Sequence, residues 1–134
     1  MDLIEEIFKN TGTIAVIGMK DDRSDAYTVP EYLSINGFII YPVNPTREGK
    51  EALGKKFFNR VDEITDEIDL VEIFRRPEFI PGHVKEILKM NPLPKYVWFQ
   101  LGIENDSAAE ELERKGIRVV QNACMLVEHR MLKS

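Results

Sequence analysis

The sequence predicts an α/β protein with a doubly wound, mostly parallel sheet of five strands and helices on both faces. Apolar segments of strand length alternate along the chain with segments whose apolar residues recur at helical spacing. The strand segments are apolar at nearly every position, as parallel strands are when helices cover both faces. Because crossovers between parallel strands are right-handed, we expect the strand order 3-2-1-4-5. The 134 residues fit a single domain over 1–134.

The expected strands span residues 13–17, 38–43, 69–74, 95–100 and 117–121. The expected helices span residues 3–8, 25–36, 77–90, 107–115 and 124–132. Gly37 and Gly116 follow two of these helices, where glycine is a favoured C-terminal cap. Pro30 is expected within the first turn or so of its helix, where the missing N–H costs little. The segment 46–66 is the least regular part, and Phe57-Phe58 predicts a short edge segment.

Composition narrows the classes of function. The net charge of -5 argues against a broad basic face for nucleic acid. No apolar run reaches the roughly 18 residues that span a bilayer, and the first residues lack the basic region of a signal peptide. The single cysteine, Cys124, excludes an internal disulfide or a multi-cysteine metal site and fits a reducing compartment. We therefore expect a cytoplasmic protein that binds neither nucleic acid nor membranes.

The first expected strand, residues 13–17, ends on Gly18 and opens into a polar loop that leads into a helix. This is how open α/β sheets build phosphate sites. Glycine lets backbone approach the ligand, and N–H groups of the first helical turn point at the anion. A nucleotide-like cofactor is the first hypothesis.

Such a cofactor binds beyond the carboxyl ends of the strands, near the point where the strand order reverses. The residues expected there, at or just beyond the strand ends, are Gly18, Met19, Lys20, Arg23 and Ser24 for the first strand, Val43, Asn44, Pro45 and Arg47 for the second, Phe74, Arg75, Arg76 and Pro77 for the third, Gln100 and Gly102 for the fourth, and Asn122 and Cys124 for the fifth. Five of them are cations in an acidic chain, although Asp21, Asp22, Asp25 and Glu48 dilute their charge.

An NAD(P)-binding Rossmann protein is an alternative. The G-x-G-x-x-G pattern is absent, since Gly18 stands alone. The second strand ends in Val43-Asn44-Pro45, whereas an NAD site carries an acidic residue at this position to bind the ribose 2′-hydroxyl. A dehydrogenase would also need a second domain for its substrate, and the chain has no length left for one.

Several of these residues also have a purely structural interpretation. Lys20 and Arg23 fit solvated loop charges as well as phosphate ligands, and one of Arg75 and Arg76 is expected to face solvent. Asn44 and Pro45 both favour turns, and Cys124 can serve as a small buried apolar side chain.

Five short motifs, taken together, suggest a family. The chain contains, in order, Val16-Ile17-Gly18, Tyr41-Pro42-Val43-Asn44-Pro45, Phe74-Arg75-Arg76-Pro77, Trp98-Phe99-Gln100-Leu101-Gly102-Ile103 and Asn122-Ala123-Cys124. With these motifs it resembles the small stand-alone CoA-binding domain proteins, which are similar to the N-terminal domain of the succinyl-CoA synthetase α subunit. The resemblance implies a Rossmann-like fold that binds coenzyme A at the carboxyl edge of the sheet. One departure is Met19-Lys20, where relatives usually carry a small pair such as Ala-Ser.

Under this resemblance each part of the cofactor has an expected partner. The backbone after Gly18, with Ser24, would hold the pyrophosphate, and Lys20 and Arg23 would add charge-assisted hydrogen bonds. Arg47 would meet the 3′-phosphate. The other expected contacts are Phe74 and Pro77 as a wall for adenine, Gln100 and Gly102 for the pantetheine amides, and Asn122 and Cys124 near the thiol.

The chain shows no catalytic constellation, neither a Ser–His–Asp set nor a Walker-type loop. His83 and His129 have no partners at metal-ligand spacing, so no metal is expected. The leading function is a stand-alone, non-catalytic module that binds CoA or acyl-CoA. One alternative is the CoA-binding subunit of an ADP-forming acyl-CoA ligase assembled with a partner subunit. Another is a mixed disulfide between Cys124 and CoA.

Overall fold

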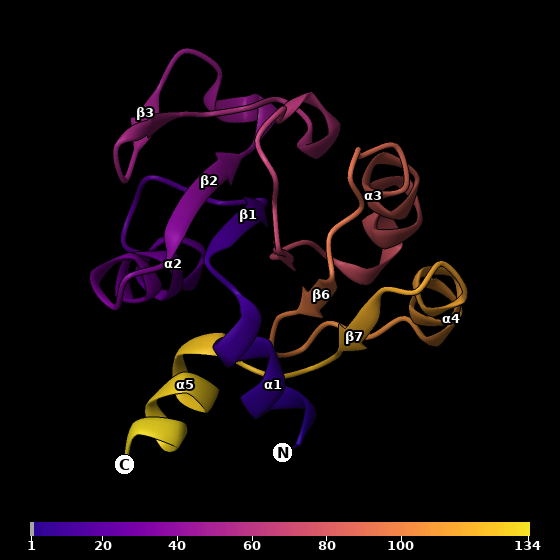
Figure 1. The fold of residues 1–134 in the computed structure, drawn as a ribbon. Coiled ribbons are helices and arrows are strands. Elements are labelled where there is room, and N and C mark those ends of the chain that lie inside the picture. The colour runs from indigo at the N-terminus through magenta and orange to yellow at the C-terminus, as the bar shows by residue number, and fades with distance from the viewer. Residues whose placement is uncertain (1) are drawn as a thin grey trace.

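Residues 2–134 are described here in a computed structural model (Figure 1). The helices are α1 (Leu3–Asn10), α2 (Asp25–Ile35), α3 (Ile80–Ile87), α4 (Asp106–Arg114) and α5 (Met125–Lys133). The main strands are β1 (Thr13–Ile17), β2 (Ile39–Val43), β5 (Leu70–Ile73), β6 (Tyr96–Phe99) and β7 (Arg118–Val120). Every expected strand and helix is present, with ends that differ from the expected ones by at most three residues. The segment between β2 and β5 holds two short 3-10 turns and a small hairpin of β3 (Glu51–Ala52) and β4 (Lys55–Lys56).

The five main strands are parallel and lie in the order β2-β1-β5-β6-β7. Counted along the chain, this order is 2-1-3-4-5. The doubly wound α/β class is therefore confirmed, but the third strand lies beside the first, not outside the second as the expected order 3-2-1-4-5 had it. The order reverses between β1 and β5, so the ligand crevice is expected between these two strands.

Pro42 gives a physical reason for this order. Its carbonyl accepts a hydrogen bond from Phe58 N (2.9 Å) on the side of β2 away from β1. In a strand the N–H and the C=O of one residue point to the same side, so Pro42 lacks a donor on that outer side. A proline of this kind is tolerated only at a sheet edge. A third strand therefore pairs with β1, and Phe58 adds only an isolated bridge to the outer side of β2, at Val43.

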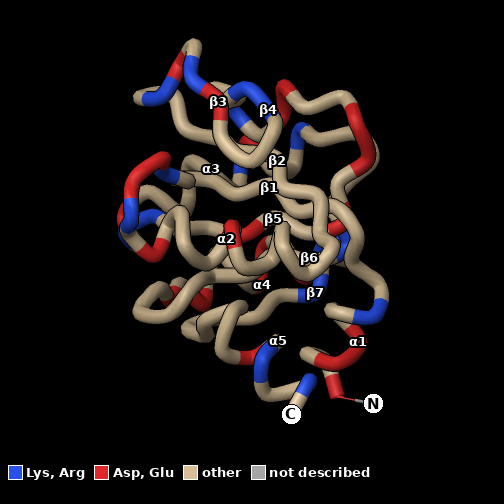
Figure 2. Tube along the Cα trace, turned by 90° about the vertical axis from the view of Figure 1, so that its left-hand side faces the viewer, with Lys and Arg blue, Asp and Glu red and all other residues tan. Residues whose placement is uncertain are grey.

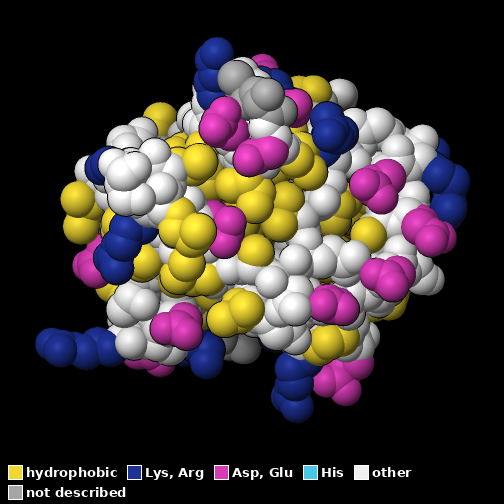
Figure 3. Space-filling model, turned by 90° about the horizontal axis from the view of Figure 1, so that it is seen from below, with side chains coloured by type: hydrophobic (Ala, Val, Ile, Leu, Met, Phe, Trp, Pro, Cys, Tyr) yellow, Lys and Arg dark blue, Asp and Glu magenta, His cyan; other side chains and the backbone are white. Residues whose placement is uncertain are grey.

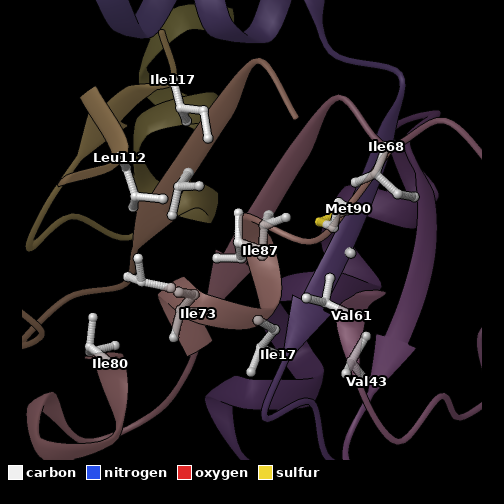
Figure 4. Close-up of a cluster of buried hydrophobic side chains, with 14 of the residues drawn as sticks. Ile17, Val43, Val61, Ile68, Ile73, Ile80, Ile87, Met90, Leu112 and Ile117 are labelled. Carbon is white, nitrogen blue, oxygen red and sulfur yellow. The ribbon is translucent and has the colours of Figure 1, made fainter. Parts of the chain in front are cut away.

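The sheet has a helical layer on each face (Figure 1). Helices α2 and α5 pack together on one face, with α1 against α5, and α3 and α4 cover the other. Strand residues alternate between the two layers: Val16 and Trp98 pack in the α2 and α5 layer, and Ile17 and Ile73 pack in the α3 and α4 layer. Figure 4 shows the second cluster, in which Ile80 and Ile87 of α3 and Leu112 of α4 meet the strands.

One buried side chain breaks the apolar pattern of the sheet. Glu72 of β5 lies in register with Val16 on one side and Trp98 on the other, and it is fully buried. Neither of its carboxyl oxygens has a hydrogen-bond partner within residues 2–134. Burial without a partner disfavours the charged form and raises the pKa of Glu72 to about 8.

The first described residues and the C-terminus both lie at the end of the molecule away from the β3–β4 hairpin (Figures 1 and 2). Acidic and basic positions are interspersed over the molecule, and neither sign is confined to one side of the trace (Figure 2). The face seen from below carries exposed apolar side chains between charged ones (Figure 3). Within residues 2–134, no helix combines the length and the apolar character needed to cross a bilayer.

Candidate functional site

Gly18 stands where the strand order reverses, directly after β1. Its φ is +81°, a region that side chains disfavour, and a Cβ there would overlap the carbonyl oxygen of Phe74. Gly18 N donates to Val43 O (2.8 Å), and Phe74 N donates to Ile17 O (2.9 Å). The glycine therefore lets the segments that leave β1, β2 and β5 converge. The sequence interpretation had assigned this freedom to a close approach by a ligand.

Pro30 shapes the loop after Gly18. It lies in the second turn of α2, just past the position where a missing N–H costs nothing, so the carbonyl of Ala26 receives no N–H from residue 30. Lys20 N donates to that free carbonyl at 3.2 Å. The buried Asn44 side chain holds the same loop from the other side, since its Nδ2 donates to Met19 O at 2.9 Å. The loop is thus fixed to both α2 and the end of β2.

Three adjoining hollows lie along this carboxyl edge, and Arg75 lines all of them. We call them the central, the β6-side and the α3-side hollow. The Nε of Arg75 is buried and has no partner within residues 2–134, and its guanidinium carbon lies 4.3 Å from the centre of the Phe79 ring. Arg75 is thus supported by an aromatic ring and retains unused hydrogen-bond donors.

The central hollow, of about 310 Å³, gathers the positive charge of the edge. It is lined by Gly18, Lys20, Asn44, Thr46, Arg47, Phe74, Arg75, Arg76 and Phe79. Behind it, Asp21 accepts from Arg47 Nε at 2.8 Å and lies 3.4 Å from Lys50 Nζ. The hydrogen bond from Arg47 holds the pKa of Asp21 below its ordinary value. Four cations and no carboxylate line this hollow, which suits it to phosphate groups.

The β6-side hollow, of about 520 Å³, extends from the α2 N-terminus to the α5 N-terminus. Its lining comprises Lys20, Ser24, Asp25, Ala26, Phe74, Arg75, Arg76, Pro77, Gln100, Leu101, Gly102, Ile103 and Cys124. Two contacts fix its far end: Trp98 Nε1 donates to Ala123 O (2.8 Å), and Met125 N donates to Gln100 Oε1 (3.3 Å). Cys124 is therefore held at the N-cap of α5 as a half-buried free thiol.

The α3-side hollow, of about 400 Å³, lies on the other side of Gly18. Its lining comprises Ile17, Gly18, Val43, Asn44, Pro45, Glu48, Asn59, Arg60, Arg75, His83 and Glu86. Polar contacts ring it: His83 Nδ1 lies 3.0 Å from Glu86 Oε1, and Asn59 Nδ2 donates to Glu48 Oε1 at 3.2 Å. Sequence reasoning missed Asn59, Arg60, His83 and Glu86, because none of them directly follows a main strand.

The structure gathers most of the expected site residues around these hollows, with three exceptions. Met19 is fully buried in the core, so only its backbone reaches the loop. Arg23 lines a separate hollow with Asp21, Asp22 and residues of α2. Asn122 accepts from Gly102 N at 2.7 Å and donates to Glu104 at 2.9 Å, so it shapes the loop after β6 and does not line the site.

Comparison with known proteins identifies the family. Residues 12–130 match the family model described as CoA binding domain. The chain belongs to this CoA-binding domain family. Protein YneT of Bacillus subtilis (strain 168) is 38% identical over 132 residues, which is 97% of this chain and 94% of YneT.

Solved structures agree with this family. The structure of cell-free ID.343 from Thermus thermophilus has a TM-score of 0.90 at 33% identity, with 96% of each chain covered. A more distant fold likeness is to the Ca. Korarchaeum cryptofilum dinucleotide forming Acetyl-coenzyme A synthetase 1 in complex with phosphate and ADP. There the TM-score is 0.68 at 21% identity, over 91% of this chain and 28% of the synthetase. The Rossmann-like CoA-binding fold implied by the sequence motifs is thus confirmed.

Proposed function

We propose that this CoA-binding domain protein binds coenzyme A, or an acyl-CoA, along the carboxyl edge of its sheet as a non-catalytic module. The observation that carries the proposal is the central hollow, where Lys20, Arg47, Arg75 and Arg76 converge although the chain has a net charge of -5. A dinucleotide such as NAD brings only a diphosphate to such a site. Coenzyme A adds a third phosphate, which this excess of cations suits.

The residues present fit the cofactor from end to end. The diphosphate would lie in the central hollow beside Gly18, with Lys20 and Arg75 as its cationic partners. Arg47, which lines the same hollow, would meet the 3′-phosphate, and the Phe74 ring would support adenine. Arg23 lies outside the three hollows, so the charge there would come from the other cations.

The pantetheine arm would occupy the β6-side hollow. Gln100 and the backbone of Gly102 offer it polar groups, while Leu101, Ile103 and Pro77 give apolar contacts. Pro77 lines this hollow only, so it would contact pantetheine and not adenine. The thiol would point toward Cys124. A single cysteine without an internal disulfide partner fits the reducing, cytoplasmic location that we also propose.

Titration calorimetry with CoA, dephospho-CoA, ADP and NAD tests this proposal. We expect CoA to bind most tightly, because dephospho-CoA lacks the 3′-phosphate, and ADP and NAD lack both this phosphate and the pantetheine arm. Tighter binding of NAD than of CoA, or no heat from CoA, would rule the proposal out.

A second candidate is the CoA-binding subunit of an ADP-forming acyl-CoA ligase assembled with a partner subunit. The shared fold favours it, because that fold makes up only 28% of the acetyl-coenzyme A synthetase chain. This candidate requires a complex that forms acyl-CoA from a carboxylic acid, CoA and ATP. Isolation of the tagged protein from its native cells, followed by that assay on the eluate, separates the two candidates.

A further inference from the structure

Asp21 and Arg47 join two loops of the central hollow through a continuous chain of hydrogen bonds. Arg47 Nε donates to Asp21 Oδ1 at 2.8 Å, and Arg47 Nη1 donates to Thr46 Oγ1 at 2.8 Å. Thr46 Oγ1 in turn donates to Asn44 Oδ1 at 2.8 Å, and Asn44 Nδ2 donates to Met19 O at 2.9 Å. The guanidinium is therefore held at two points on a network that ends in a buried amide.

Among residues 2–134, Asp21 and Thr46 are the partners of Arg47, and its other donors form no hydrogen bond there. Both N–H groups of Nη2 and the second N–H of Nη1 take no part in these contacts. Arg47 lines the central hollow, whereas Asp21 lines a separate hollow along α2. Asp21 thus contacts the guanidinium from outside the central hollow and leaves the side toward it free for an anion.

We propose that Asp21 is a positioning residue that holds Arg47 ready for the 3′-phosphate, so that the preference for CoA over dephospho-CoA depends on this carboxylate. The inference rests on the proposed function. A long arginine side chain loses conformational freedom when it is fixed on a ligand, and a guanidinium that is already held loses less. Asp21 and Thr46 restrict the Arg47 side chain already in the unliganded protein, so less conformational freedom is lost on binding.

Simple charge repulsion makes a different prediction. If Asp21 acted only as a negative charge near an anionic site, its removal would strengthen the binding of every phosphate ligand. CoA, with the additional phosphate, would then gain most. Positioning predicts the opposite change in selectivity, because only the 3′-phosphate uses Arg47. The ratio of the dephospho-CoA Kd to the CoA Kd distinguishes the two.

The experiment measures that ratio by calorimetry for the wild-type chain and for Asp21→Ala, Asp22→Asn, Arg47→Ala and the double variant Asp21→Ala/Arg47→Ala. Asp22→Asn is the matched control: it removes the same charge from the same loop and keeps an acceptor for Ser24 N, the partner of Asp22 at 3.0 Å. We expect Asp21→Ala to lower the ratio by about two- to tenfold, while Asp22→Asn leaves it unchanged. We also expect Asp21→Ala to have no further effect on the ratio once Arg47 is absent.

The outcomes separate this inference from the proposed function. A wild-type protein that prefers CoA, together with an Asp21→Ala ratio that is equal or higher, overturns the positioning role alone. An effect of Asp21→Ala that persists in the Arg47→Ala background also overturns it. If the wild type does not bind CoA, the proposed function fails and the inference fails with it.

Discussion

Gly18 and the carbonyl oxygen of Phe74 are packed so closely that no side chain fits between them. The two residues follow the neighbouring parallel strands β1 and β5, at the point where the strand order reverses. Their contact brings the loop that carries Lys20 next to the segment that carries Arg75. The glycine is thus required for the packing of the two segments, and this packing places the residues of the proposed site.

Replacing this glycine should cost more stability than replacing one that has only an unusual backbone angle. Gly116 has a similar φ of +85°, but apart from its chain neighbours no atom of the described residues lies within 4 Å of where a Cβ would stand. Gly116→Ala should therefore cost about 1–2 kcal/mol from the left-handed conformation alone. Gly18→Ala adds a collision with backbone and should cost about 3 kcal/mol or more. Urea denaturation of both variants measures this difference. Equal losses would show that the approach of Phe74 is not what requires glycine.

Glu72 should make the protein less stable as the pH rises. Its folded-state pKa of about 8 lies above the ordinary 4.5, so between these values the folded state keeps a proton that the unfolded chain has lost. The free energy of unfolding should therefore fall by about 1.4 kcal/mol per pH unit across this window because of this group. Glu72→Gln should remove that slope, while Glu110→Gln, at an exposed position of α4, should keep it. Denaturation curves from pH 5 to 8 test this, and an unchanged slope in Glu72→Gln would refute it.

His129 should have the opposite effect on stability and make the protein more stable as the pH rises. Its Nδ1 lies 2.8 Å from the Tyr32 hydroxyl, and its ring packs against Phe8 and Phe38. Burial, followed by the nearby Lys133 charge, lowers the pKa of His129 below 6.5. The neutral ring therefore contributes stability above pH 6.5 that is lost as the pH falls through the lower folded-state pKa. An NMR titration of the imidazole checks this, and a midpoint at or above 6.5 would count against it.

Arg75 and Arg76 should contribute unequally to binding. Arg75 lines all three hollows over the Phe79 ring, whereas the Arg76 side chain is 79% exposed and lies 3.7 Å from Glu78. We expect Arg75→Ala to weaken CoA binding by about tenfold or more and Arg76→Ala by about threefold at most. Calorimetry on the two variants decides the matter. A larger loss from Arg76→Ala would mean that the ligand lies on the outer side of this segment.

Much of the fold could be predicted from the sequence because strand and helix periods alternate clearly. Pro42 carried a further signal, since a proline within an apolar strand indicates a sheet edge, and this would have excluded the order 3-2-1-4-5. The lining of the α3-side hollow could not be predicted in this way. Asn59 and Arg60 belong to an irregular segment, and His83 and Glu86 project from a helix toward the sheet edge.

For the site, strand ends were a good guide to which segments meet and a poorer guide to side-chain direction. Met19 and Lys20 are adjacent, yet one is fully buried in the core and the other lines two hollows. Only the tertiary contacts of the loop decide between them. One such contact, from Lys20 N to Ala26 O, exists because Pro30 leaves that carbonyl free.

A crystal structure of the protein grown with saturating CoA tests the central claim most directly. We predict the diphosphate in the central hollow between Gly18 and Arg75, the 3′-phosphate against Arg47, and the pantetheine thiol close to Cys124. CoA bound at another surface, or a central hollow left empty at saturation, would contradict the account.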